Sequence, residues 1–186
     1  MRFFKLHLTF IICSIFLLSA CSEKSEYVSM VEEGLDSGKV VNDIFLGYTF
    51  GMTRKEFLDY SWDLNQKEVI TGGTKVIYML EDLKSTVRLE FFPEIKNNVV
   101  TKMPVSASYI SWSPWNEQYN ADELLMDMRA YYEGTYSTTF KEVVVPEIEQ
   151  TAWVSIEGNR EIRLYKNSVN TIQINFIDLS QIDQKS

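Results

Sequence analysis

The sequence predicts an α+β fold: an antiparallel sheet with helices on one face, built from two successive α-β-meander units. Two segments place apolar residues at helical spacing directly after a capping signal, one at Thr53 and one at Asn120. Much of the remaining chain alternates apolar and polar residues with a period of two, which is typical of half-buried strands. Turn signals separate these runs, so we expect the strands to be joined as hairpins.

The first helix is expected to begin after Thr53. Thr53 is a favourable N-cap, and Glu56, three residues later, completes a capping box that satisfies two free backbone N–H groups. An apolar stripe on one helical face follows, made of Phe57, Leu58, Ser61, Trp62 and Leu64. Such a helix would bury this stripe against the sheet.

Strands are expected after this helix. The run from Val87 to Phe91 alternates apolar residues with Arg88 and Glu90. Turns are predicted at Gly72-Gly73 and over residues 94–98, where glycine or asparagine interrupts the alternation. These strands and the first helix would form the first unit, about residues 40–110.

The second helix is expected to begin after Asn120, with Glu123 three residues later, and to end at Gly134. Its apolar stripe consists of Leu124, Leu125, Met128, Tyr131 and Tyr132. Alternating runs follow at 161–164 and 172–176, and Gly158-Asn159 is a signal for a two-residue hairpin. The second unit, about residues 111–180, would therefore repeat the order of a helix and three or four strands.

The N-terminus carries a different signal. Arg2 and Lys5 precede a nearly continuous apolar run from Leu6 to Leu18, which is the layout of a secretory signal and too short for a membrane-spanning helix. The run ends in Leu18-Ser19-Ala20-Cys21, which resembles the lipobox of bacterial lipoproteins. The resemblance implies that residues 1–20 are removed and that Cys21 becomes the lipidated first residue. It also implies a lipid-anchored envelope protein, with the outer membrane of a Gram-negative bacterium as the expected location.

Residues 21–39 are polar and acidic. They are expected to form a lipidated tether, and the sequence leaves open whether a short helix forms around Tyr27–Glu33. The tether would precede a single α+β domain over residues 40–180 and a tail at 181–186. The lipid would hold the protein to the membrane, because stable attachment needs acyl chains when no basic surface is present.

Composition excludes several classes of function. The chain has 26 acidic against 18 basic residues and a net charge of −8, so it would repel nucleic acid. The single histidine, His7, and Cys13 lie in the signal, and lipid would block Cys21. A mature chain without histidine or a free thiol cannot form a Ser-His-Asp triad, a Cys-His pair or an imidazole metal site. No cofactor and no metal are expected.

A second resemblance concerns the first helix. The run Gly51-Met52-Thr53-Arg54-Lys55-Glu56 resembles the Gly-Met-Thr-x-x-Glu helix start of small outer-membrane lipoproteins associated with the barrel-assembly machine. That resemblance implies a β-lactamase-inhibitor-protein-like fold made of helix-plus-hairpin units. The chain departs from that family in having two units and no internal disulfide.

The segment from Tyr109 to Tyr119 is the candidate binding surface. Its aromatic residues Tyr109, Trp112, Trp115 and Tyr119 surround Pro114, which excludes the interior of a sheet. Two interpretations stay open. The rings either complete the core over the second helix or form a surface that binds a protein or a glycan.

Acidic residues could supply a carboxylate pair for glycoside hydrolysis. The candidates are Glu81-Asp82, Glu90 with Glu94, and Glu117 with Asp122-Glu123. None has a distinctive spacing, and the dipole of the second helix already explains acidic residues in its first turn.

The sequence therefore predicts a lipid-anchored envelope protein whose domain is not an enzyme and binds another envelope protein. The alternative is a glycan-binding accessory lipoprotein with Trp112 and Trp115 as a stacking platform. A carboxylate-based hydrolase is the second alternative.

Overall fold

The computed structural model describes residues 25–182, so the predicted signal peptide, Cys21 and the last four residues lie outside the described part. The α-helices are α2 (Glu26–Asp36), α3 (Arg54–Gln66) and α4 (Ala121–Tyr136). The strands are β1 (Thr71–Gly72), β2 (Val76–Leu80), β3 (Val87–Phe91), β4 (Glu94–Lys96), β5 (Val99–Tyr109), β6 (Lys141–Val145), β7 (Gln150–Glu157), β8 (Arg160–Lys166) and β9 (Ile172–Asp178). Short 3-10 helices lie at Glu117–Tyr119, Pro146–Ile148 and Leu179–Gln181.

The strands form one antiparallel nine-stranded sheet in the order β1-β2-β3-β5-β9-β8-β7-β6, with β4 paired to β5. The predicted α+β class, with a helix followed by strands twice in succession, is confirmed. The two units meet where β5 pairs with β9, from Lys102 opposite Ile177 to Ala107 opposite Ile172. The units therefore share one continuous sheet.

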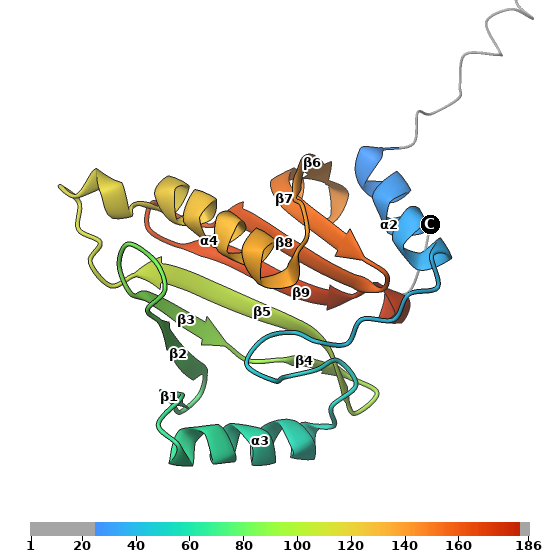
Figure 1. Ribbon diagram of the computed structural model, residues 1–186, viewed down its shortest axis with the longest axis horizontal. Helices are drawn as coiled ribbons and strands as arrows, with labels where there is room; N and C mark the ends of the chain where they lie inside the picture. The colour runs from blue at the N-terminus through green and yellow to red at the C-terminus, as the bar shows by residue number, and fades with distance from the viewer. Residues whose placement is uncertain (1–24, 183–186) are drawn as a thin grey trace, which may run out of the picture.

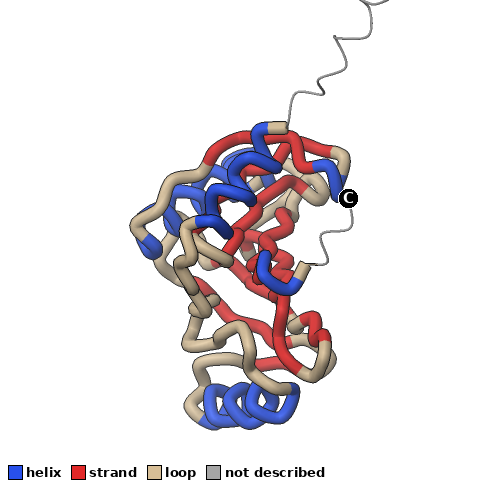
Figure 2. Tube along the Cα trace, turned by 90° about the vertical axis from the view of Figure 1, so that its right-hand side faces the viewer, coloured by secondary structure: helices blue, strands red, loops and turns tan. Residues whose placement is uncertain are grey.

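One face of the sheet, called here the α4 face, carries the main hydrophobic core. Phe91, Val105, Ile174 and Leu164 lie directly opposite one another on four adjacent strands, and all four are buried. Phe57 and Leu64 of α3, and the buried residues of α4, join this core. Figure 1 shows α4 lying across β8 and β9. Figures 1 and 2 show α3 at the opposite end of the molecule from Ser25, where the described chain begins.

Both predicted helix starts are confirmed. The Glu56 backbone N–H donates to Thr53 Oγ1 at 3.2 Å, and the Thr53 N–H donates to the Glu56 carboxylate at 2.7 Å, which completes the capping box. Asn120 Oδ1 accepts from the Glu123 N–H at 2.9 Å. The predicted stop at Gly134 is wrong, because α4 continues to Tyr136. Ser137 then takes a left-handed conformation, with φ 51° and ψ 44°, and ends the helix.

The structure corrects two further expectations. The sequence places residues 26–36 in the tether and leaves a short helix around Tyr27–Glu33 open; they form helix α2, which packs on β6 and β7 with the ring of Tyr27 buried. The α2 helix also lies on the opposite face of the sheet, called here the α2 face, so helices do not cover one face alone. The turn predicted over 94–98 is shorter than expected. Glu94–Lys96 is strand β4, and only Asn97 and Asn98, with φ of 52° and 67°, form the turn.

The hairpin predicted at Gly158-Asn159 is confirmed, since Glu157 pairs with Arg160 across it. Gly158 has φ 61°, and a Cβ there would overlap the carbonyl oxygen of Lys39, so glycine is required on both counts. Asn159 is buried, and its Oδ1 accepts from the Val41 N–H at 2.7 Å. This contact fixes the segment that leads into the loop at 43–48.

Candidate functional site

The four aromatic residues singled out in the sequence have different environments. Tyr109 is buried, donates a hydrogen bond to the Asp127 carboxylate, and meets Tyr119 edge to face with ring centroids 5.4 Å apart. Trp112 and Tyr119 are half-buried against the main core. Trp115 is 86% exposed. Of the four, only Trp115 offers most of its side chain to a partner, and binding through this segment stays a prediction.

Several of the candidate carboxylates lie beside basic side chains. Glu90 is 2.7 Å from Arg88, Glu94 is 2.8 Å from Lys102, and Glu123 is 2.8 Å from Lys84. Asp122 is 2.7 Å from Lys166. Glu81 and Asp82, in contrast, are exposed at the end of β2. Across residues 25–182 there is no group of three or more His, Cys, Asp or Glu that could hold a metal ion.

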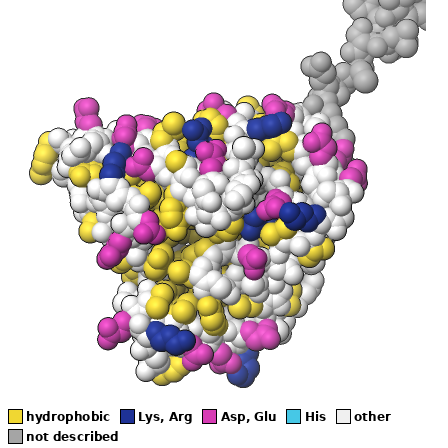
Figure 3. All heavy atoms as spheres, viewed as in Figure 1, with side chains coloured by type: hydrophobic (Ala, Val, Ile, Leu, Met, Phe, Trp, Pro, Cys, Tyr) yellow, Lys and Arg dark blue, Asp and Glu magenta, His cyan; other side chains and the backbone are white. Residues whose placement is uncertain are grey.

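A cavity that the sequence did not indicate opens on the α4 face. It has a volume of about 290 Å³ and lies between the loop 43–48, strand β2 and helix α4. We call it the tyrosine pocket, because its walls include Tyr48, Tyr78, Tyr131, Tyr132 and Tyr136. Aliphatic side chains of Ile44, Leu46, Leu80 and Leu89 complete much of the lining. In Figure 3 hydrophobic side chains gather in a hollow on this face.

Helix α4 supplies one wall of the tyrosine pocket. Tyr131 and Tyr132 meet edge to face with centroids 5.4 Å apart, and Tyr132 stacks on Tyr136 at 5.7 Å. Tyr132 also contacts Phe176 of β9 at 5.6 Å. The rings are therefore held by the core beneath them, and this wall is formed before any ligand binds.

The loop 43–48 supplies the opposite wall, and long-range hydrogen bonds hold it. The Tyr136 hydroxyl donates to the carbonyl oxygen of Ile44, and the Tyr60 hydroxyl donates to that of Leu46 at 2.7 Å. A buried guanidinium, that of Arg160, donates to the carbonyl oxygen of Asp43 at 3.1 Å. Gly47 has φ 84°, and a Cβ there would overlap the Tyr60 hydroxyl. The loop is thus fixed from α3, α4 and β8.

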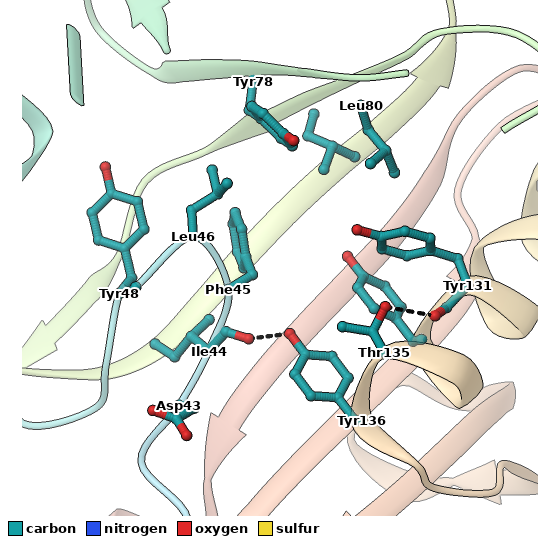
Figure 4. A pocket seen from close by; sticks show the side chains of 13 residues that line it. Asp43, Ile44, Phe45, Leu46, Tyr48, Tyr78, Leu80, Tyr131, Thr135 and Tyr136 are labelled. Atoms are coloured by element: carbon teal, nitrogen blue, oxygen red, sulfur yellow. Dashed lines mark hydrogen bonds between the residues drawn. The ribbon is translucent and has the colours of Figure 1, made fainter. Parts of the chain in front are cut away.

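The pocket interior combines aromatic faces with free hydroxyl groups. Figure 4 shows the hydroxyls of Tyr78 and Tyr131 turned toward each other across the pocket. Neither hydroxyl makes a hydrogen bond to another residue in the part of the chain that the structure describes. Burial raises the pKa of Tyr78, Tyr132 and Tyr136 above the ordinary tyrosine value, so these phenols stay protonated at neutral pH. The free hydroxyls of Tyr78 and Tyr131 can donate hydrogen bonds to a ligand, and the aromatic faces can pack against its apolar parts.

Searches of protein-family models, curated proteins and solved structures find no match to this chain. In residues 25–182 the helices are all too short or too polar to cross a bilayer.

Sequence reasoning missed the tyrosine pocket for an identifiable reason. The spacing of Tyr131 and Tyr132 fits the apolar stripe of a helix and therefore predicts that both belong to the core, and Tyr132 is buried. Tyr136, five residues beyond Tyr131, lay past the expected end of the helix at Gly134. The clustering of three tyrosines within six residues was the one available signal.

Proposed function

We propose that this chain is a lipid-anchored protein of the cell envelope, attached through Cys21, whose domain binds a segment of another envelope protein without catalysing a reaction. The anchor rests on the lipobox-like run Leu18-Ser19-Ala20-Cys21. A β-lactamase-inhibitor-protein-like fold is part of the same proposal, and the repeated order of a helix followed by strands supports it.

The observation that carries the proposed binding function is the tyrosine pocket. Tyrosine is enriched at protein interfaces because it combines a large rigid apolar ring with a hydrogen-bonding group. Here five such residues line one cavity, and its walls are held in place by the core and by hydrogen bonds. A preformed site loses little conformational entropy on binding, which favours affinity.

The chemistry of the pocket supports binding over catalysis. A general base must accept a proton near neutral pH, whereas the raised pKa values of Tyr132 and Tyr136 keep their hydroxyls protonated. Asp43 lines the cavity and is exposed, so its carboxylate is placed to meet a positively charged group of a partner.

A photo-reactive amino acid at position 135 tests this proposal in intact cells. Thr135 lines the tyrosine pocket and is exposed on α4, so its replacement would report on whatever occupies the cavity. We expect a cross-link to one protein from this position and no cross-link to that protein from Lys55, an exposed position on α3. A cross-link to cell-wall glycan alone would favour the glycan-binding alternative.

A further inference from the structure

The outer edge of β2 lies beside the tyrosine pocket and is only partly paired. Strand β1 pairs with β2 at two positions, Thr71 with Ile77 and Gly72 with Val76. Beyond Ile77, residues Tyr78, Met79 and Leu80 have β3 on one side and no strand on the other in the described part of the chain. Tyr78 and Leu80 also line the tyrosine pocket. The free edge and the cavity are thus contiguous.

The register shows which backbone groups point outward from this edge. The Ile110 N–H donates to the Thr86 carbonyl oxygen at 3.1 Å, one position beyond the Val87–Tyr109 pair. Because backbone direction alternates along an antiparallel strand, Val87 and Leu89 direct their N–H and C=O groups to β2. Their partners Leu80 and Tyr78 are then turned toward β3, and the N–H and C=O of Met79 point to the open side.

The composition of this edge is unusual for one left exposed. Natural sheets protect their edges with charged residues, proline or a covering element. The opposite edge strand, β6, begins with Lys141 and Glu142 and has α2 packed against it. Strand β2 is Val-Ile-Tyr-Met-Leu, and the Met79 side chain is 43% exposed. This edge has none of these protections at Met79.

We propose that an extended segment of the partner protein adds to β2 as an antiparallel strand and places large apolar side chains at the tyrosine pocket. This inference rests on the proposed function and specifies how the same pocket is occupied. The partner residue opposite Met79 would form two backbone hydrogen bonds with it. Its two neighbours would lie opposite Tyr78 and Leu80, on the side of the sheet where the cavity opens.

Charge determines which segment fits. Glu81 and Asp82 follow β2 directly, both are exposed, and neither is in an ion pair with another described residue. In an antiparallel strand, the residues opposite them precede the residue opposite Leu80. We therefore expect the partner segment to contain one or two basic residues, followed by two large apolar residues with one residue of any kind between them. The partner segment cannot pair with β2 beyond Tyr78, because the next residue, Ile77, is already paired with Thr71 of β1.

Selection from a phage-displayed library of random twelve-residue peptides tests this inference. The full-length chain in detergent micelles is the target, and the enriched peptides are synthesised and titrated. We expect them to share the basic-apolar-x-apolar pattern and to slow hydrogen exchange of the Met79 amide. Met79→Pro removes the outward N–H, and proline is tolerated where a strand N–H faces solvent, so the variant should fold. It should weaken peptide binding about tenfold or more.

Met79→Thr is the matched control, because it changes the side chain and keeps the N–H; peptide affinity should stay within about twofold of wild type. If Tyr131→Ala weakens binding of the enriched peptides and Met79→Pro does not, strand addition is overturned and the proposed function stands. If neither variant weakens binding of the enriched peptides, strand addition and the proposed function are both overturned. If the selection enriches no peptide, strand addition is overturned. Self-association of the chain that Met79→Pro abolishes would show that a second copy occupies the edge, which also overturns a peptide partner.

Discussion

The hydroxyl of Tyr27 in α2 donates a hydrogen bond of 2.9 Å to the carboxylate of Glu161 in β8, 134 residues away in the chain. The same hydroxyl accepts a bond of 2.7 Å from Arg163, whose Nε donates to Glu161 at 2.5 Å. Glu161 is completely buried, and its ion pair with Arg163 lies on the α2 face. Tyr27 therefore closes a buried polar network and makes α2 part of the folded domain.

Tyr27→Phe should destabilise the domain by about 1–3 kcal/mol, because the buried carboxylate loses a hydrogen-bond donor that water cannot replace. Denaturant unfolding of residues 25–182 measures the difference. Tyr165→Phe is the control, since Tyr165 is half-buried in the same region and its hydroxyl has no hydrogen bond to a described residue. Equal unfolding midpoints for Tyr27→Phe and wild type would mean that α2 does not close the network in solution.

Thr53→Ala and Asn120→Ala should each cost about 0.5–2 kcal/mol, the usual loss when a capping oxygen is removed. Each side chain accepts from the backbone N–H of the residue three positions later. Thr53→Ser retains the oxygen and should stay close to wild type. Unchanged denaturation midpoints in both alanine variants would contradict the assigned helix starts.

The stability of the domain should fall as the pH rises above 10. Burial raises the pKa of Tyr27, Tyr109, Tyr132 and Tyr136 above the ordinary value of 10.0. The unfolded chain releases these protons near pH 10 while the folded chain keeps them. The stabilising contribution of these protonated tyrosines is therefore complete below pH 10. It is lost as the pH rises through the pKa values that the tyrosines have in the folded chain.

Absorbance of tyrosinate measures this effect directly. Part of the signal from the 10 tyrosines should develop only well above pH 10 in the folded chain, and all of it near pH 10 in denaturant. Tyr136→Phe should remove some of the late signal. Ionisation of every tyrosine near pH 10 with the fold intact would show that these phenols are not shielded.

The sequence predicted those parts of the fold that depend on local signals. The capping box at Thr53 and the two-residue hairpin at Gly158-Asn159 need only neighbouring residues, and both are present. The alternation from Val87 to Phe91 likewise placed the apolar side chains on the buried face. Period-two burial and capping are determined within a few residues, so they can be read before the tertiary structure is known.

The tyrosine pocket and the role of α2 could not be predicted in this way. The loop 43–48 has no distinctive pattern, and it is held by hydrogen bonds from Tyr60, Tyr136 and Arg160, which are distant in the sequence. Helix α2 mixes acidic and apolar residues, and its docking includes the contact of Tyr27 with a polar network that β8 supplies. Both features arise from long-range contacts that a single sequence does not encode locally.

Cys21→Ser should abolish lipid attachment and leave the chain unprocessed or released from the membrane. An acidic chain with a net charge of −8 has no electrostatic attraction to anionic lipid, so acyl chains are needed for stable anchoring. Metabolic labelling with a fatty-acid analogue measures the attachment. Equal label on the variant and on wild type would rule out Cys21 as the modified residue.

Trp115→Ala should leave the unfolding free energy within about 0.5 kcal/mol of wild type, because a side chain that is 86% exposed buries little apolar surface. Trp153 is the contrasting position, since the Arg129 guanidinium lies 4.1 Å from its ring centroid and the ring packs against the main core. Trp153→Ala should therefore cost about 2 kcal/mol or more. Denaturant unfolding measures both variants, and acrylamide quenching should lose its most accessible component in Trp115→Ala alone. A Trp115→Ala variant as unstable as Trp153→Ala would mean that Trp115 packs into the core in solution, and the segment from Tyr109 to Tyr119 would then be purely structural.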